Sequence, residues 1–426
     1  AARKQPARGA GDAGDRPRRG PKEGSRLLPL LIAAIDGIFA PPEECPVIDP
    51  TPLTPRQRFL NCMEYRPVDR VPNHELGVWP QTRDRWEQEG LNRYLLHWDW
   101  FEGEEYFDMD PREFIDVRYD MRPPFEEVVL ERTDRYEIVQ HSNGIVTKAL
   151  LEGTVDGGRM SMDQYLRFPV TNLDDWRALK RRYDPHLPSR YPPQWRVERV
   201  RGWRTREHVL VLGRNCAAAG FYWRAREWMG TEGVSYGWYD DPALMHDMME
   251  FFADFTIEVS QPILEATDVD YFVLNEDFAM KSGPLLSPDT FRRFIYGPMR
   301  RLVEFMKTHG VRYVALDSDG NCEPLIPLLM DLGIDILWPL ERAANMDPLR
   351  IRRQFGKSLR LWGGVDKRLL PHGPQAIEAH LRELAPLIEE GGYIPTIDHT
   401  VPPDISLDNF CHYMRIKRQL LEGRLG

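Results

Sequence analysis

The sequence predicts an α/β protein: a single (β/α)8 TIM-type barrel with an inserted β-hairpin and a disordered N-terminal extension. Three observations support this fold class. Short apolar runs alternate with helical patterns through the C-terminal half, which is typical of a parallel sheet covered by helices. Most of these runs change abruptly to acidic residues, as the catalytic ends of barrel strands do. No GxGxxG motif follows the first predicted strand, so a dinucleotide-binding sheet lacks its fingerprint.

Eight apolar runs are candidates for the barrel strands. About eight parallel strands favour a closed barrel over an open, doubly wound sheet. The runs are Arg70–Leu76, Phe114–Val117, Val209–Leu212, Tyr271–Asn275, Tyr313–Leu316, Ile334–Pro339, Leu359–Trp362 and Tyr393–Ile397.

Amphipathic helical patterns lie between the later runs. Asp241-Pro242 is a helix start, since Asp caps and Pro suits the first turn. Ser287-Pro288 starts another helix, which we expect Gly297-Pro298 to divide. A third pattern ends at Gly391. Their apolar stripes contain Leu244, Met245, Met248 and Phe252, then Leu302, Val303 and Met306, then Ile377, Leu381, Leu384 and Ile388.

Two insertions interrupt the barrel pattern. Tyr136–Val139 and Ile145–Leu150 flank Ser142-Asn143-Gly144, and Asn-Gly between alternating runs is a strong hairpin signal. We expect this hairpin to cover or edge the barrel. Residues 177–206 are rich in Arg, Pro and Trp, and they are predicted to form a surface connection.

Residues 1–50 are predicted to be a disordered or non-native extension, and residues 51–426 the barrel domain. Residues 1–26 carry no large apolar side chain, so they cannot bury enough surface to offset the entropy of ordering. Leu27 to Ile35 resembles a secretory signal, but Pro29 interrupts it and Asp36 ends it. A fragment or a misplaced start is the simpler interpretation, because the sequence does not begin with Met.

Charge and composition narrow the classes of partner. The formal net charge is −10, which argues against nucleic acid. No run of 18 apolar residues predicts a membrane span. Five scattered cysteines without a CxxC pair fit a reducing compartment, so we expect a cytoplasmic protein. The expected partner is a small-molecule substrate. The sequence leaves the oligomeric state open.

Charged residues at the predicted strand ends are the candidate site. Converging carboxylates repel one another unless they share a cation, which here is a metal ion, a cationic substrate, or a lysine. A strand end meeting water with a helix cap is the alternative for any single acid. The residues at these ends are Glu75, Glu276, Asp277, Lys281, Asp317, Asp319, Glu341, Asp366, Lys367, Asp398 and His399.

Three interpretations fit Asp317-Ser318-Asp319 together with His399. Alternate residues of a strand face one side, so both carboxylates and the imidazole could bind a divalent metal. They could instead act as a general acid and base, or one Asp could cap the loop at Gly320. His399 follows Asp398 directly, so we expect their side chains to point apart. Arg226 is a candidate clamp for a substrate carboxylate.

Several motifs together are similar to those of a known superfamily. They are Thr54-Pro55-Arg56-Gln57-Arg58-Phe59, Asp69-Arg70-Val71-Pro72, Glu276-Asp277 with Gly283-Pro284 and Ser287-Pro288, Asp317-Ser318-Asp319-Gly320-Asn321, Gly363-Gly364-Val365-Asp366-Lys367, Gly391-Gly392-Tyr393-Ile394 and Asp398-His399. Over about Thr51 to Leu421 the chain resembles the uroporphyrinogen decarboxylase (URO-D) superfamily, which includes corrinoid-linked methyltransferases. This resemblance implies a (β/α)8 barrel, but no one reaction.

The sequence departs from both branches of that superfamily. Decarboxylases carry Arg-Gln-Ala-Gly-Arg after the first strand to hold substrate carboxylates, whereas this chain reads His74-Glu75-Leu76-Gly77-Val78-Trp79. Methyltransferases often carry His-x-Cys and a later Cys that bind zinc. The corresponding residues here are Asp317, Asp319 and His399, so a harder metal than zinc, or none, is expected.

The leading hypothesis is methyl transfer between a small O- or N-methylated substrate and a corrinoid on a partner protein. Decarboxylation of uroporphyrinogen or a related polycarboxylate is the alternative, and a non-catalytic tetrapyrrole-binding barrel is a third. The candidate catalytic residues are Asp317, Asp319, His399, Glu276 and Asp277. The candidate substrate-binding residues are Glu75, Arg226, Lys281, Glu341, Asp366, Lys367 and Asp398.

Overall fold

The computed structural model describes residues 52–95, 101–152, 162–213 and 220–425. The predicted disordered extension, residues 1–50, lies outside this described part, as do Cys45 and Cys216. Everything below concerns the described residues of the domain that begins at Pro52.

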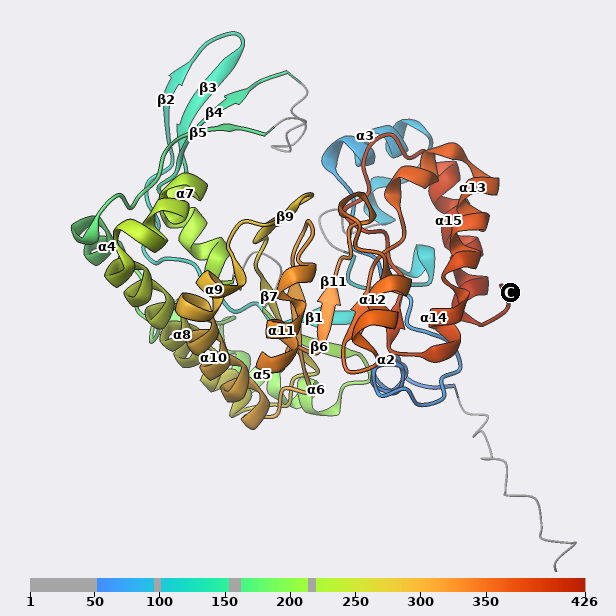
Figure 1. Cartoon of the computed structure of the whole chain (residues 1–426). Helices are drawn as coiled ribbons and strands as arrows, with labels where there is room; N and C mark the ends of the chain where they lie inside the picture. Colours follow the sequence, from blue (N-terminus) through green and yellow to red (C-terminus); the bar gives the residue numbers. More distant parts are fainter. Residues whose placement is uncertain (1–51, 96–100, 153–161, 214–219, 426) are drawn as a thin grey trace, which may run out of the picture. The chain divides into compact units, whose positions relative to one another are not determined.

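A seven-stranded parallel sheet forms the centre of the domain (Figure 1). Its strand order is β1-β6-β7-β10-β11-β12-β13, so neighbours in space follow each other along the chain. This is the order of a barrel wall, because each strand is followed by a helical return. The strands are β1 (Arg112–Phe114), β6 (Val209–Leu212), β7 (Tyr271–Asn275), β10 (Tyr313–Asp317), β11 (Ile336–Trp338), β12 (Arg360–Trp362) and β13 (Tyr393–Ile394).

An extended segment, residues 71–79, takes the eighth place in the wall. On one side, Phe101 N–H donates to Leu76 O and Asp110 N–H to Asn73 O. On the other side, Val78 bridges Val401 in parallel. These contacts link the residues just before β1 to those after β13, which agrees with the predicted TIM-type barrel.

The first strand, predicted over Arg70–Leu76, is extended but forms no regular ladder. Pro72 has no N–H to donate, and side chains take bonds that a ladder would use. Asn73 N–H donates to Asp110 Oδ2, and Ile397 N–H donates to Glu75 Oε2.

The barrel interior is filled by alternate strand residues. Tyr271 and Val273, Tyr313 and Ala315, and Ile336 and Trp338 all belong to one buried cluster. Helix α2 (Pro55–Met63) adds Phe59, which lies 5.6 Å from Tyr271 between ring centroids. Thr54 and Gln57 form the capping box that begins this helix.

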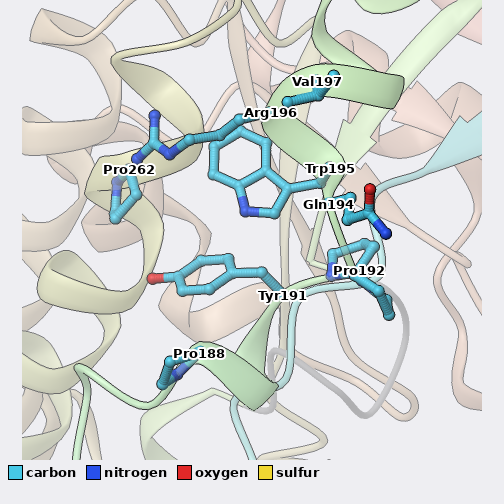
Figure 2. Close-up of a pocket in the computed structure, with 9 residues that line it drawn as sticks. Pro188, Tyr191, Pro192, Gln194, Trp195, Arg196, Val197 and Pro262 are labelled. Atoms are coloured by element: carbon cyan, nitrogen blue, oxygen red, sulfur yellow. The ribbon is translucent and has the colours of Figure 1, made fainter.

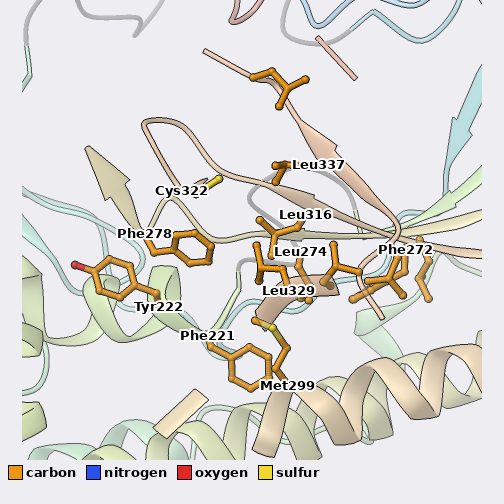
Figure 3. Close-up of a cluster of buried hydrophobic side chains, with 14 of the residues drawn as sticks. Phe221, Tyr222, Phe272, Leu274, Phe278, Met299, Leu316, Cys322, Leu329 and Leu337 are labelled. Atoms are coloured by element: carbon orange, nitrogen blue, oxygen red, sulfur yellow. The ribbon is translucent and has the colours of Figure 1, made fainter. Parts of the chain in front are cut away.

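The other face of each strand packs against the surrounding helices. Figure 3 shows Phe272, Leu274 and Leu316 from the strands meeting Phe221 and Met299 from the helices. The long helices are α7 (Phe221–Asp240), α8 (Pro242–Leu264), α10 (Gly297–Thr308), α13 (Pro374–Glu383) and α15 (Leu407–Leu421). The shorter helices are α3 (Pro80–Gln88), α4 (Leu173–Lys180), α5 (Trp195–Glu198), α6 (Val200–Thr205), α9 (Pro288–Thr290), α11 (Ile326–Leu332), α12 (Pro348–Phe355) and α14 (Ala385–Glu390).

Single turns link these elements. They are the 3-10 turns η1 (Arg93–Leu95), η2 (Glu105–Phe107), η3 (Pro188–Arg190), η5 (Glu323–Leu325), η6 (Arg342–Ala344) and η7 (Lys367–His372), with the π-helical turn η4 (Phe291–Tyr296).

The predicted helix starts are confirmed, and one predicted break is wrong. Asp241 accepts from Leu244 N–H at the start of α8, and Ser287 accepts from Thr290 N–H. Gly297-Pro298 does not divide its helix. Gly297 keeps helical dihedrals after η4, since Pro298 in the first turn of α10 needs no N–H donor.

The predicted hairpin is part of a larger insertion, a four-stranded antiparallel sheet that stands apart from the parallel sheet in Figure 1. Its order is β2-β3-β4-β5, and the Asn143-Gly144 turn joins the middle pair. The strands are β2 (Val128–Arg132), β3 (Tyr136–Gln140), β4 (Val146–Leu150) and β5 (Gln164–Arg167). A two-stranded ribbon, β8 (Ala279–Met280) and β9 (Gly283–Pro284), follows β7.

Residues 177–206 are not a simple surface connection. Trp195 and Trp203 are buried in the main core, and Arg190 is fully buried. The Arg190 guanidinium donates to the carbonyl oxygens of Asp184, Arg118 and Asp120, which fixes the path of this segment. The prediction of a surface connection rested partly on the arginines of this segment, but Arg190 lies in the interior and holds the backbone in place there.

No helix within the described ranges combines the length and the apolar character that crossing a membrane requires.

Candidate active site

Asp317 is the last residue of β10 and continues the inward-facing row of Tyr313 and Ala315. In register it lies beside Asn275 of β7 and Trp338 of β11. The Asp317 side chain is buried and has no hydrogen-bond partner among the described residues. Burial raises the pKa of Asp317 well above its usual value, and the charges of Asp277 and Asp319 raise it further.

Asp277 and Asp319 meet beside Asp317. Asp319 N–H donates to Asp277 Oδ1 at 3.0 Å. Asp277 has a positive φ of 40°, a turn conformation that Asp tolerates better than most residues. Burial, and then the charge of Asp319, raises the pKa of Asp277 to about 6. Three carboxyl groups from the ends of β7 and β10 therefore share one small region.

His399 joins this group through Asp319. Its Nε2 atom lies 3.2 Å from Asp319 Oδ2. Burial lowers the pKa of His399, but the hydrogen bond and charge of Asp319 outweigh that effect, so the pKa is raised. The imidazole is thus favoured as a cation next to the acidic cluster.

Glu276 stands at the start of α7. Its two carboxylate oxygens accept from Phe221 N–H and Tyr222 N–H at 2.9 and 2.8 Å. Burial raises the pKa of Glu276 to about 8, although these backbone donors lower it. Gly220 makes the contact possible, because a Cβ there would lie 2.2 Å from the Glu276 carboxyl carbon. Glu276 therefore fixes α7 to the end of β7.

Arg226 of α7 reaches the same region. Its Nη1 donates to Asp277 O at 3.3 Å, and its Nη2 lies 3.9 Å from Asp277 Oδ2. The guanidinium stacks over the Trp223 ring at 4.6 Å. About 29% of the Arg226 side chain is exposed, so donors remain for a ligand.

Glu341 and Lys367 close the other side of the acidic loop. Lys367 Nζ lies 3.2 Å from Glu341 Oε1, and Glu341 Oε2 accepts from Gly320 N–H. Gly320 has a positive φ and approaches Ala279 O so closely that any side chain would clash. This contact holds the β8–β9 ribbon against the loop that carries Asp319.

Asp398 and Asp366 serve the backbone. Asp398 is fully buried and accepts from Arg342 N–H and Lys367 N–H, so it ties the loops after β11 and β12 together. Asp366 caps η7 and pairs with the Arg368 guanidinium. As predicted, the Asp398 and His399 side chains point to different partners.

Glu75 and Lys281 lie away from the acidic cluster. Glu75 is buried against α15, where it accepts from Lys417 Nζ and Tyr413 O–H. Its neighbour His74 is also buried. Lys281 is exposed at the turn between β8 and β9, with no partner in the described part of the chain. Neither side chain is brought to Asp317, and both remain untested as substrate contacts.

The predicted metal ligands Asp317, Asp319 and His399 stay a prediction. Nowhere in the described ranges do three or more His, Cys, Asp or Glu side chains form a group able to hold a metal ion. Asp319 and His399 pair with each other. Cys322, the nearest thiol in sequence, is buried, and burial raises its pKa to about 12.

Sequence reasoning missed the residues that line this site without being acidic. Trp338 and Asn275 occupy the same layer as Asp317, and Tyr222 and Trp223 precede Arg226 on α7. The alternation of inward-facing residues could have found Asn275 and Trp338 once the strands were placed. Strand alternation could not find Tyr222 and Trp223, because they lie on helix α7 and not on a strand.

Hollows are also found elsewhere in the described part of the chain, and two of them bear on the predicted residues. One of about 460 Å³ is lined by Tyr191, Trp195 and several prolines beside α8 (Figure 2). It contains none of the predicted site residues. The other, of about 480 Å³, is polar and includes Asp366 among three arginines and their carboxylate partners.

A parallel barrel that gathers carboxylates at the carboxyl ends of its strands has the architecture of a TIM-barrel enzyme. The profile of the uroporphyrinogen decarboxylase (URO-D) family matches residues 227–420, which include all the residues of the acidic cluster. This part of the chain is therefore similar to the URO-D family.

Curated uroporphyrinogen decarboxylases are also similar to the chain. The chain is 26% identical over 189 residues to a uroporphyrinogen decarboxylase of Acidiphilium cryptum, covering 44% of this chain and 50% of that protein. It is 27% identical over 172 residues to a uroporphyrinogen decarboxylase of Nocardia farcinica, covering 39% and 46%. The chain thus spans about half the length of the curated relatives it matches.

A methyltransferase from Methanosarcina mazei has the same fold. Its solved structure superimposes with a TM-score of 0.57 over 86% of this chain and 99% of that one, at 17% sequence identity. The likeness establishes the barrel independently of the sequence motifs.

Proposed function

We propose that this protein is an enzyme that transfers a methyl group from a small O- or N-methylated substrate to a corrinoid carried on a partner protein. One observation carries the proposal. Asp317 is a buried carboxyl group without a hydrogen-bond partner in the described ranges, beside Asp277 and the Asp319–His399 pair.

Asp317 supplies the acid or the anion that such a transfer needs. The methyl carbon is transferred to the electron pair of the reduced corrinoid, and the pair of the broken C–O or C–N bond stays on oxygen or nitrogen. A leaving alkoxide requires a proton, and burial raises the pKa of Asp317, which favours the protonated form that can donate one. A quaternary ammonium leaves as a neutral amine, and it requires an anion beside it instead.

Asp319, His399 and Asp277 set the charge around Asp317. His399 is favoured as a cation by Asp319, so this pair is close to neutral. Asp277 is anchored by Asp319 N–H and by Arg226. Asp317 is therefore the acidic side chain of this group that has no basic partner among the described residues. It faces the barrel axis with Trp338.

The family profile and the two curated relatives favour decarboxylation of uroporphyrinogen as a second candidate. The segment in place of the arginine motif weighs against it, because His74 and Glu75 are buried and Glu75 is already bonded to Lys417. A polyanionic substrate would also meet Asp317 and Asp277 with a Coulombic cost.

The test is a spectroscopic assay of both reactions. Purified protein is mixed with cob(I)alamin and a panel of methyl ethers and methylated amines, and the absorbance of methylcobalamin is followed. The same preparation is given uroporphyrinogen III, and any products with fewer carboxyl groups are separated. Methylcobalamin formation that is lost in Asp317→Asn supports methyl transfer. Product from uroporphyrinogen without methyl transfer overturns it, and activity retained after Asp317→Ala removes the proposed site.

A further inference from the structure

Helix α7 carries three hydrogen-bond donors close together, and no described residue accepts from two of them. Arg226 lies four residues after Tyr222 and three after Trp223, so it is next to both on the helix surface. The Tyr222 hydroxyl and Trp223 Nε1 are buried and have no hydrogen-bond partner among the described residues. Figure 3 shows the Tyr222 hydroxyl directed away from Phe278, its neighbour in the core.

Arg226 completes this donor group. Among the described residues its guanidinium donates only one hydrogen bond, to Asp277 O, and the planar group is held in place by Trp223. A guanidinium has five N–H groups in a fork that fits a carboxylate. Leaving buried donors unpaired is costly, so the set suits an anion that the described residues do not supply.

A subsite that suits a cation lies on the other side of Asp277. Asp317 is a buried, partnerless carboxyl group in register with Trp338, and both face the barrel axis. A carboxylate beside an indole ring is the combination that recognises an ammonium group, including a fully methylated one that cannot donate hydrogen bonds.

Asp277 separates the two subsites by one side chain. It lies 3.9 Å from Arg226 on one side, and it accepts from Asp319 N–H on the other. A ligand that satisfies both subsites carries a negative and a positive charge a short distance apart.

We propose that the substrate is a small zwitterion in which an N-methylated ammonium and a carboxylate lie on one molecule. The carboxylate binds Arg226, Tyr222 and Trp223, and the ammonium binds beside Asp317 and Trp338. This inference rests on the proposed methyl transfer for its chemistry, but the binding step can be measured without turnover. It selects the N-methylated over the O-methylated substrates and assigns Asp317 the role of counterion.

The test is calorimetric titration of the full chain with four probes. Glycine betaine and γ-butyrobetaine carry both charges at two spacings, choline carries the cation alone, and acetate carries the anion alone. We expect one betaine to bind at least about tenfold more tightly than choline and acetate, because a charge-assisted carboxylate contact is added.

Variants separate the two subsites. Arg226→Gln and Tyr222→Phe are expected to remove or reduce the preference for the betaine over choline and to leave choline binding unchanged. Asp317→Asn is expected to weaken betaine and choline equally and to spare acetate. Arg300→Gln, a surface arginine of α10 that pairs with Glu304, is the matched control with no expected effect.

Equal affinity for the betaines and choline overturns the inference, as does absence of binding by every probe. A betaine preference without methyl transfer keeps the subsites and rejects the proposed function. Methyl transfer from ethers that Arg226→Gln leaves unchanged keeps the function and rejects the zwitterion.

Discussion

His399 Nε2 lies 3.2 Å from Asp319 Oδ2, which joins the end of the last strand to the loop after β10. These two residues are 80 positions apart in sequence. In this protein they form an ion pair. Because Asp319 and His399 pair with each other, Asp317 is left without a partner in the described site. Both proposals depend on this unpaired carboxyl group.

The Asp319–His399 pair predicts a defined pH dependence of stability. The folded-state pKa of His399 is raised, so the contribution of the pair is fully present below the ordinary histidine value of 6.5 and is lost as pH rises through the folded pKa. His399→Gln should therefore lower the unfolding temperature more at pH 5.5 than at pH 9. The loss should stay below about 1 kcal/mol, because both side chains are partly exposed. A difference that does not change with pH contradicts the assignment.

Asp317→Asn should impair methyl transfer without unfolding the protein. We expect the rate of methyl transfer to fall by about 10²- to 10⁴-fold if Asp317 donates a proton. A rise in KM with little change in kcat is expected if it holds a cation. Removing a buried, partnerless carboxyl group should leave the unfolding temperature unchanged or higher. Asp174→Asn, on the exposed start of α4, is the matched control.

Gly220→Ala should destabilise the protein, because its Cβ would lie 2.2 Å from the Glu276 carboxyl carbon. A loss of about 1–3 kcal/mol in the free energy of unfolding is expected from urea titration. Adding Glu276→Ala should cost less in the Gly220→Ala background than in the wild type. Gly297→Ala is the control, since Gly297 is helical and nothing lies near its added Cβ. Additive losses would show that the two residues do not meet.

Lys417→Met should be among the most destabilising single substitutions, because it leaves Glu75 buried without its cation. Breaking a buried ion pair costs about 3–5 kcal/mol. The double variant Lys417→Met with Glu75→Gln should recover part of that loss in the same urea titration. A double variant as unstable as the sum of its single variants would argue that Glu75 has another role.

Metal content offers a separate check on the acidic cluster. Elemental analysis of protein purified without chelators is expected to find no divalent metal at one equivalent per chain, because Asp319 and His399 bind each other. One equivalent of metal that disappears in Asp319→Asn would restore the metal interpretation of Asp317, Asp319 and His399.

The barrel could be predicted from the sequence because its strands are local patterns. Val209–Leu212 and Tyr271–Asn275 coincide with β6 and β7, and Asp241 caps α8 as expected. The irregularity of the first strand could not be predicted, because side-chain hydrogen bonds to Asp110 and to Ile397, both distant in sequence, take the place of ladder bonds. The burial of residues 177–206 depended likewise on Arg190 finding carbonyl groups near residue 118.

The sequence by itself determined which residues stand at the strand ends, since an apolar run that stops at an acid can be read locally. Only the tertiary structure decided what each acid does. Asp398 and Glu75 are bonded to backbone or to lysine in the interior, whereas Asp317 is left without a partner. The reason is physical: the charge state and availability of a buried carboxyl group depend on donors that other segments bring within 3 Å, and no pattern along the chain records them.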